Sequence, residues 1–395
     1  MNQATAHFAS LQKPLRLAVY DFLRTSTDPR HLDGVRRLWQ ASARSGDFYL
    51  RDYTGRYCLG CEQFYADDER CLEHETPPEV VTEQNWFFRL SRYSGEILEL
   101  LESGRIRIEP AARRREVLGF VRAGLSDISV SRPASRSDGW GIPVPGSPDQ
   151  VIYVWWDALA NYLTADPARW TGATERVHVI GKGILRFHAV YWPALLLSAG
   201  ERLPDTIFVH DYLAVDGAKI SKSAGNTVRP TDLIDRYGAD AVRWWLLREV
   251  APLGDTDFTE ARLIARADQE LANGLGNLVH RVLSLARRTG RITSASPLRT
   301  VHPLADRIDA ALADFDFRAA TGAVVEVIAD ANRYVEQTRP WTLDGTDLDE
   351  VLGTVVSTCR ELATELSPFL PDGAARLHAQ LTSGAPARLY PRLAQ

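Results

Sequence analysis

A change of hydrophobic pattern along the chain is the feature that most constrains its fold. Between residues 151 and 215, short apolar runs (VIYVWW, VHVIG, TIFVH) alternate with one helical pattern, FHAVYWPALLLSAG. Strand-length runs that alternate with helices indicate a parallel α/β unit. From about residue 228 the pattern is helical to the end, with breaks predicted at 252–254, 297–303 and 340–345. The sequence therefore predicts an α/β half followed by an all-α domain.

The first 150 residues have a mixed pattern. Residues 1–50 are predicted to be mostly helical, because apolar positions such as Leu15, Val19 and Leu38 recur at roughly helical spacing. Residues 51–145 are rich in arginine, proline and turn signals, with a cysteine cluster near the start. At 395 residues the chain is long enough for two or three domains, each with a core of its own.

The composition excludes several classes of protein. The hydrophobic content of 45% and the charged content of 25% are those of an ordinary globular protein. No apolar run approaches the ~20 residues that a membrane span needs. The N-terminus also lacks the basic start and apolar stretch of a secretory signal. We therefore expect a cytoplasmic protein without a membrane partner.

Four residues near the start of the mixed segment have the spacing of a metal site. Two residues separate Cys58 from Cys61, and two separate Cys71 from His74. Two such pairs, brought together by a loop, suit tetrahedral zinc, and four protein ligands leave no open position for a catalytic water. The alternatives are disulfides, although three cysteines cannot all pair, and a cluster of thiols with His74 merely on the surface. The spacing favours a structural zinc ion, Zn2+.

The lysines are few and clustered. Of the 46 basic residues only four are lysine, and three of these, Lys182, Lys219 and Lys222, lie in the segments VIGKG and KISKS. Where arginine occupies nearly every other basic position, a remaining lysine points to a need for a compact ammonium group. Gly217 and Gly225 bracket the KISKS loop. Two ammonium groups on such a loop can close over a triphosphate and stabilise the charge that develops as pyrophosphate leaves.

Two aromatic stripes predict a binding slot. They comprise Trp155, Trp156 and Tyr162 in IYVWWDALANYL, and Phe187, His188 and Trp192 in GILRFHAVYW. Packing in a core is the ordinary explanation for a single stripe. Two stripes at the ends of predicted parallel strands lie where an open α/β sheet binds its ligands. An aromatic slot of this kind suits an unbranched thioether side chain.

Together these segments resemble the methionyl-tRNA synthetases, a family of class I aminoacyl-tRNA synthetases. KISKS resembles the family's second signature, usually KMSKS, and HVIGKGILRFHAVYWPALL resembles its pocket segment. SDISVSRP and WGIPVP resemble the stretch that precedes the pocket. DFLRTSTDPRH and YCLGCE resemble the connective domain and its zinc knuckle. The resemblance runs from about residue 16 to residue 345, with the motifs in the family's order.

The resemblance implies an α/β plus all-α fold that contains a partial class I Rossmann catalytic domain. Residues 1–150 would form a connective-peptide-like insert with the zinc knuckle, and residues 151–215 the C-terminal half of the Rossmann domain. The KISKS loop and a stem-contact segment would occupy residues 216–262. Residues 263–395 would form an α-helical anticodon-binding-like bundle.

The resemblance also implies roles for individual residues. Lys219 and Lys222 would be catalytic and would bind the phosphates of ATP and its Mg2+, together with Gly181 and Ser221. The amino acid would be bound by Trp155, Tyr162, Gly183, Phe187, His188 and Trp192. The CAU anticodon of tRNA would be read by Asn277, Arg281 and Trp341. Asn277 and Arg281 lie four positions apart, so the two share a helical face, and an exposed tryptophan offers a plane on which an unstacked base can lie.

Two features depart from the family pattern. The family's HIGH signature is not found in these residues. We expect the segment that carries it, with two or more βαβ-sized elements, to precede residue 1. Gly183 stands where the family's GKD motif has its aspartate. A carboxylate is therefore missing beside the pocket, which bears on recognition of methionine.

The expected function is a ligase that activates an amino acid, methionine by resemblance, with ATP and transfers it to tRNA. Without HIGH the chain could be inactive alone, and a separate polypeptide could supply the missing half. One alternative is a repurposed synthetase that joins an amino acid to a small amine or hydroxylamine. Another is a non-catalytic tRNA-binding protein. The lysines of KISKS favour catalysis, and the anticodon residues argue against a purely small-molecule acceptor.

Overall fold

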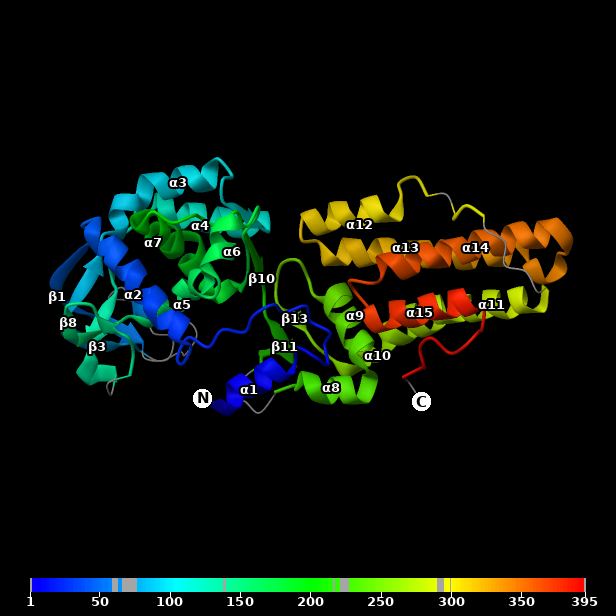
Figure 1. Cartoon of the computed structure of the whole chain (residues 1–395), viewed down its shortest axis with the longest axis horizontal. Coiled ribbons are helices and arrows are strands. Elements are labelled where there is room, and N and C mark those ends of the chain that lie inside the picture. The colour runs from blue at the N-terminus through cyan, green and yellow to red at the C-terminus, as the bar shows by residue number, and fades with distance from the viewer. Residues whose placement is uncertain are drawn as a thin grey trace. The chain divides into compact units, whose positions relative to one another are not determined.

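The computed structural model describes residues 2–58, 63–65, 77–137, 140–215, 217–220, 227–289, 295–298 and 300–393. The chain forms two compact units (Figure 1). One consists of residues 21–210 and is called the first unit below. The other combines residues 211–395 with residues 1–20 and is called the second unit. Each has a buried apolar cluster of its own.

In the residues that the structure describes, the first unit contains three small sheets and the helices that cover them. Its strands are β1 (Phe48–Cys58), β2 (Gln63–Tyr65), β3 (Glu79–Phe88), β4 (Arg107–Glu109), β5 (Ile128–Ser129), β6 (Ser131–Pro133), β7 (Pro143–Val144), β8 (Ser147–Ile152), β9 (Val177–Gly181) and β10 (Thr206–His210). Its α-helices are α2 (Pro29–Arg44), α3 (Ser94–Glu102), α4 (Ala111–Arg122), α5 (Val154–Thr164), α6 (Pro167–Gly172) and α7 (Trp192–Ala199).

A three-stranded parallel sheet confirms the predicted α/β unit. Its order is β4-β10-β9, and α7 lies between β9 and β10 in the chain. Along β9, His178 and Ile180 are buried, whereas Val179 on the other face is 63% exposed. The strand β4 precedes residue 151, so the sheet includes a segment that was predicted to belong to the insert.

The prediction for VIYVWW is wrong in one respect. The strand β8 ends at Ile152 and pairs antiparallel with β6 and β7, not with the parallel sheet. Trp155 and Trp156 lie in the first turn of α5 instead of at the end of a parallel strand. A short apolar run fits a buried strand and a buried helix equally well, and here it contains the end of one and the start of the other.

The helix α5 is held closely against α2. In α2, the buried His31 has its Nδ1 2.7 Å from Thr164 Oγ1 and its Nε2 hydrogen-bonded to Asp157. A methyl group at Gly34 would overlap the Thr164 side chain, so this approach requires a glycine. Trp156 of α5 is buried in the core, and its ring centroid lies 5.3 Å from that of Trp39 of α2. The helix that carries Trp155 and Tyr162 is thus fixed against α2.

The second unit is largely helical, as predicted beyond residue 228. Its α-helices are α1 (Asn2–Ser10), α8 (Pro230–Tyr237), α9 (Ala239–Glu249), α10 (Glu260–Arg266), α11 (Asn277–Thr289), α12 (Leu304–Ala313), α13 (Phe317–Thr338), α14 (Gly345–Glu365) and α15 (Pro371–Ser383). A π-helix, η5 (Ala267–Gly276), joins α10 to α11. A small sheet is formed by β11 (Leu213–Val215), β12 (Ala218–Lys219) and β13 (Thr256–Asp257). The first two predicted breaks fall between helices, and the third, 340–345, spans a 3₁₀ turn (Pro340–Thr342) and ends at the first residue of α14.

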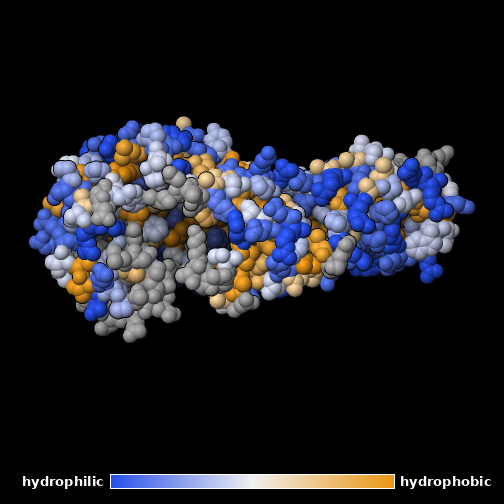
Figure 2. All heavy atoms as spheres, turned by 90° about the horizontal axis from the view of Figure 1, so that it is seen from below, coloured by the Kyte–Doolittle hydropathy of each residue, from blue (hydrophilic) through white to orange (hydrophobic). Residues whose placement is uncertain are grey.

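The helices of the second unit pack around one apolar core. Trp244 and Trp245 of α9 are almost completely buried in it, together with apolar residues of α11, α13 and α14. On the face shown in Figure 2, hydrophilic residues predominate over the helical bundle. None of the described helices has the length and apolar character that crossing a membrane requires.

The prediction that residues 1–50 are mostly helical holds only in part. Helices cover residues 2–10 and 29–44, and the segment between them contains turns and chain without regular secondary structure. Val35 and Leu38 are buried on α2, but Leu17 and Val19 are more than 40% exposed. Apolar spacing alone could not reveal this break in the helical pattern. The signal for it was Pro14 and Pro29, each of which disfavours helical backbone at the residue before it.

Candidate functional site

Most of the predicted amino-acid pocket residues lie together in the first unit. Trp155 of α5 stacks on Phe187, with ring centroids 3.9 Å apart and planes inclined by 21°. Phe187 and His188 belong to a π-helical turn, η4 (Phe187–Tyr191), that leads into α7. Two turns further along α5, the Tyr162 hydroxyl lies 2.8 Å from His188 Nε2. The two aromatic stripes therefore meet along one side of α5.

The hydrogen bonds of His188 define its protonation. Its Nδ1 lies 2.9 Å from the carbonyl oxygen of Ile184, which can only accept, so Nδ1 carries the proton. Nε2 then accepts from the Tyr162 hydroxyl. Burial lowers the pKa of His188 and raises the pKa of Tyr162 to about 12. Both side chains are uncharged at neutral pH, so this lining suits an apolar or weakly polar ligand group.

The members of this aromatic cluster differ in exposure. Phe187, His188 and Trp192 are almost completely buried, whereas Trp155 and Tyr162 are half-buried. The Trp192 ring lies 6.2 Å from the Tyr162 ring, measured between centroids. Trp155 and Tyr162 thus offer surface to a ligand, and the other three side chains pack against them in the core.

Sequence reasoning missed two members of the cluster, His178 and Trp170. The His178 ring lies 4.1 Å from the Tyr162 ring and is stacked on Trp170 at 5.9 Å. Among the described residues its buried Nε2 has no hydrogen-bond partner. The alternation in VHVIG was the available signal, because a period of two places His178 with Ile180 on the buried face of β9.

We expect the stability of the first unit to fall with acid because of His178. Burial lowers the pKa of His178 to about 3, with a smaller contribution from His188. Below pH 6.5, the ordinary pKa of histidine, the unfolded chain binds a proton at this ring and the folded chain does not. The free energy of unfolding is therefore at its full value above pH 6.5 and falls as the pH drops below it. The loss between pH 7 and pH 4.5 is about 2–3 kcal/mol.

The variant His178→Phe keeps the ring stack and removes this titration. We expect a flatter dependence of the unfolding free energy on pH, measured by denaturant titration, than in the native chain. His378→Gln, at an exposed position of α15, is the control. Equal acid sensitivity in His178→Phe and the native chain would contradict the assignment.

The two lysine segments lie at the ends of strands. Gly181 is the last residue of β9, and Lys182 and the exposed Gly183 follow it in a short 3₁₀ turn. This is the carboxyl edge of the parallel sheet, where α/β folds bind ligands. In the second unit, Lys219 ends β12 after a turn at Gly217, whose φ is +72°. The side chain of Lys219 and the whole of Ser221 and Lys222 lie outside the described residues.

Only one of the four predicted metal ligands is described. Cys58 is the last residue of β1 and is 4% exposed. Cys61, Cys71 and His74 lie outside the described residues. A buried thiol at a strand end fits a structural metal site, because such a site is enclosed by its own ligands and loop.

The predicted anticodon residues are arranged in the second unit as follows. The guanidinium carbon of Arg281 lies 5.8 Å from the ring centroid of Trp341, within range of a cation–π contact. Trp341 is 54% exposed. Asn277 is also exposed, one helical turn before Arg281 on α11. Residues far apart in the sequence thus form one cationic and aromatic surface.

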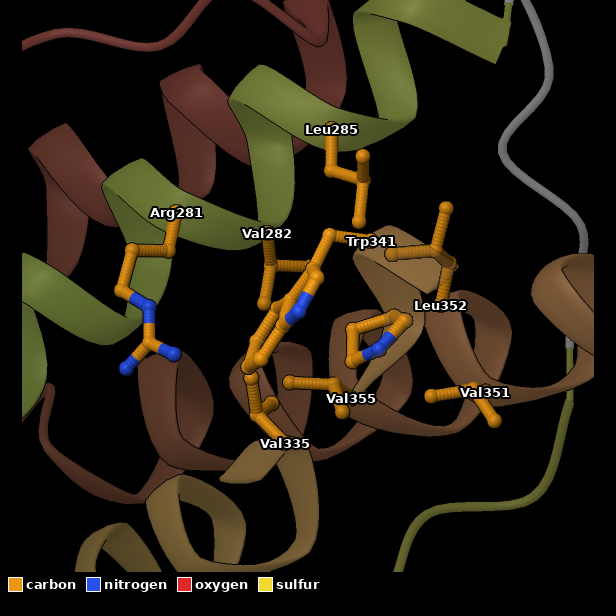
Figure 3. A pocket seen from close by; sticks show the side chains of 9 residues that line it. Arg281, Val282, Leu285, Val335, Trp341, Val351, Leu352 and Val355 are labelled. Carbon is orange, nitrogen blue, oxygen red and sulfur yellow. The ribbon is translucent and has the colours of Figure 1, made fainter. Parts of the chain in front are cut away.

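A small apolar pocket lies beside Trp341. Figure 3 shows the indole among Val282 of α11, Val335 of α13 and Val355 of α14. Its volume is about 30 Å³, room for about two water molecules. This is too small for a nucleobase, so a base would have to stack on the exposed part of the indole. The turn that presents Trp341 begins at Arg339, which has a left-handed backbone with φ +47°.

Comparison with known proteins gives one consistent family. The family described as tRNA synthetases class I (M) matches residues 67–283. Methionine–tRNA ligases of Mesorhizobium japonicum and Brucella suis are 39% and 38% identical, and each alignment covers 94% of this chain and 77% of the relative. Mycobacterium tuberculosis methionyl-tRNA synthetase in complex with methionyl-adenylate superposes with a TM-score of 0.87 at 33% identity, covering 98% of this chain and 85% of that one.

Proposed function

This chain belongs to the methionine–tRNA ligase family, and we propose that it activates methionine with ATP and transfers it to tRNA. The observation that carries this proposal is the cluster of Trp155, Tyr162 and His188, which combines stacked aromatic surface with a fixed, uncharged hydrogen-bond pair. The 39% identity to a methionine–tRNA ligase supports the same reaction.

The cluster suits the side chain of methionine for a physical reason. A thioether is unbranched and polarizable and gains from contact with aromatic rings. The exposed parts of Trp155 and Tyr162 supply such rings. Because His188 is neutral, no charge in this lining would favour a polar ligand group over the thioether. A buried imidazole that stays neutral also holds the Tyr162 hydroxyl in one orientation.

The activation step would involve the KISKS lysines. The carboxylate of the amino acid would attack the α-phosphate of ATP, so that an aminoacyl adenylate forms and pyrophosphate leaves. Lys219, Lys222 and Ser221 would stabilise the departing pyrophosphate, and the backbone at Gly181 would bind the nucleotide. Mg2+ would neutralise charge on the phosphates. The aminoacyl group would then pass to the terminal ribose of tRNA, whose anticodon would contact Asn277, Arg281 and Trp341.

Two alternative functions remain hypotheses. Gly183 is exposed at the carboxyl edge of the sheet and brings no carboxylate there, which is compatible with a small amine as the acceptor. The exposed Trp341 beside Arg281 favours tRNA as the acceptor, or a role in tRNA binding alone. A separate polypeptide that carries the HIGH signature also stays a hypothesis.

The proposed activation is tested by methionine-dependent exchange of pyrophosphate into ATP. We expect exchange with methionine and not with leucine, and a loss of about 100-fold or more when Lys219 and Lys222 are both replaced by alanine. Lys13→Ala is the matched control, because Lys13 is the one lysine outside the two motifs. Exchange that survives the double replacement would exclude this mechanism. Absence of exchange together with retained tRNA binding would favour the binding-only function.

We also propose that Cys58, Cys61, Cys71 and His74 hold a structural zinc ion. The buried position of Cys58 at the end of β1 supports this set. Metal analysis of the purified chain should return about one zinc per chain. Cys58→Ser should lower that content, whereas Cys359→Ser, at a buried cysteine of α14, should not. Well under one zinc in the native chain would reject the site.

A further inference from the structure

The last described segment of the chain, residues 384–393, packs on the π-helix η5 and is called the C-terminal strap here. Arg392 Nε donates to Asn273 Oδ1 at 2.9 Å, and the backbone N–H of Leu393 donates to Asp268 Oδ1 at 2.6 Å. Leu389 is 3% exposed in the core of the second unit. The strap therefore contacts η5 near its start and near its end.

The π-helix η5 determines where α11 begins. The two run on without a break, and Asn277 directly follows the last residue of η5. A π-helical segment is rare and departs from the hydrogen-bond pattern of the α-helices on either side of it. On another side, Asn332 of α13 donates its Nδ2 to the carbonyl oxygen of Gly274 at 3.2 Å. The strap and Asn332 thus both contact η5, in addition to the side chains that bind its Glu270.

Tyr390 anchors the strap in a closely fitted seat. A methyl group at Gly373 of α15 would overlap the Tyr390 hydroxyl and would lie 2.9 Å from Asp240 Oδ2. The Arg376 guanidinium carbon lies 5.3 Å from the centre of the Tyr390 ring. Burial, and then the neighbouring Asp240 carboxylate, raise the pKa of Tyr390, which keeps the phenol neutral. The Tyr390 ring fits between α9 and α15 only because residue 373 is glycine.

We infer that the C-terminal strap is a positioning element for the tRNA interface. It fixes η5, and through η5 it fixes the direction in which α11 presents Asn277 and Arg281. Among the described residues that line the pocket beside Trp341, none belongs to the strap. The strap therefore acts through η5 and does not form part of that pocket. This inference rests on the proposed tRNA binding.

The first test is the affinity of the full chain for a tRNA with a CAU anticodon, measured beside the same tRNA with an altered anticodon. We expect Arg392→Ala to weaken binding of the CAU form by about three- to tenfold, the effect of one lost hydrogen bond. Binding of the altered form should change little. Arg392→Gln, which can donate to Asn273 without a charge, should restore most of the discrimination.

The second test displaces the strap by a substitution in α15, outside the strap itself. Gly373→Ala should expel Tyr390 and lower discrimination between the two tRNAs, although alanine favours the helix itself. Gly322→Ala in α13 is the matched control, because its methyl would meet only the Arg248 side chain at an ordinary 3.9 Å. Thermal unfolding measured on both variants separates a general loss of stability from a loss of discrimination.

The outcomes distinguish the strap inference from the function on which it rests. If Asn277→Ala leaves tRNA affinity unchanged, the proposed anticodon contact fails. If Asn277→Ala weakens binding but Arg392→Ala and Gly373→Ala do not, the strap inference fails. Arg392→Ala could instead lower the affinity for both tRNAs equally and reduce the slope of log affinity against log salt concentration by about one. That result would identify Arg392 as a direct phosphate contact and overturn the inference. Support requires that the double variant Asn277→Ala/Arg392→Ala lose little more than Asn277→Ala alone.

Discussion

Replacing Trp341 by alanine should weaken tRNA binding by about 5- to 150-fold, because base stacking on an aromatic ring contributes ~1–3 kcal/mol. The indole is 54% exposed, and valines of three helices pack against it. Trp341→Phe should retain part of the affinity, since a smaller ring still offers a stacking plane. The measurement is a binding titration with tRNA that has a CAU anticodon.

Trp140 serves as the control for Trp341, because the two side chains are similarly exposed. Trp140 of the first unit is 52% exposed, so Trp140→Ala removes a similar amount of accessible aromatic surface. Equal losses for Trp140→Ala and Trp341→Ala would contradict the proposed tRNA interface. Arg281→Ala should differ from both by lowering the salt dependence of binding, because it removes a cation. Arg281 and Trp341 touch, so their effects should not add.

Replacing Glu270 by alanine should destabilise the second unit by about 3–5 kcal/mol, the effect of removing one partner from a buried ion pair. Glu270 lies in η5, and its side chain is 9% exposed. It accepts from Trp244 Nε1 at 2.7 Å, from Arg248 at 3.0 Å and from Arg266 at 2.8 Å. Alanine would leave two cations and one indole N–H without this acceptor.

The loss is measured as the unfolding free energy in denaturant. Glu336→Ala, at an exposed position of α13, is the matched control and should change stability by no more than about 0.5 kcal/mol. Glu270→Gln keeps an acceptor oxygen but loses the charge, so it should fall between the two. If Glu270→Ala matched Glu336→Ala, the network would contribute nothing to stability.

Local patterns predicted the elements of this fold better than their partners. The strands β9 and β10 and the helical second unit follow from runs and periods that each segment contains in itself. The pairing of β4 with β10 does not, because the strand is three residues long and its partner lies far along the chain. Likewise, the short apolar run before Trp155 could not show where a strand ends and a helix begins.

The sequence by itself determined the family, the order of the motifs and the residues proposed for chemistry in KISKS and in the cysteine pairs. Only the tertiary structure decided which side chains meet. It places His178 under Tyr162, gives His188 its proton on Nδ1, and brings Trp341 to Arg281 across two intervening helices. The physical reason is that these contacts join residues distant in sequence. Their energy depends on packing and on hydrogen bonds between elements, which no local periodicity contains.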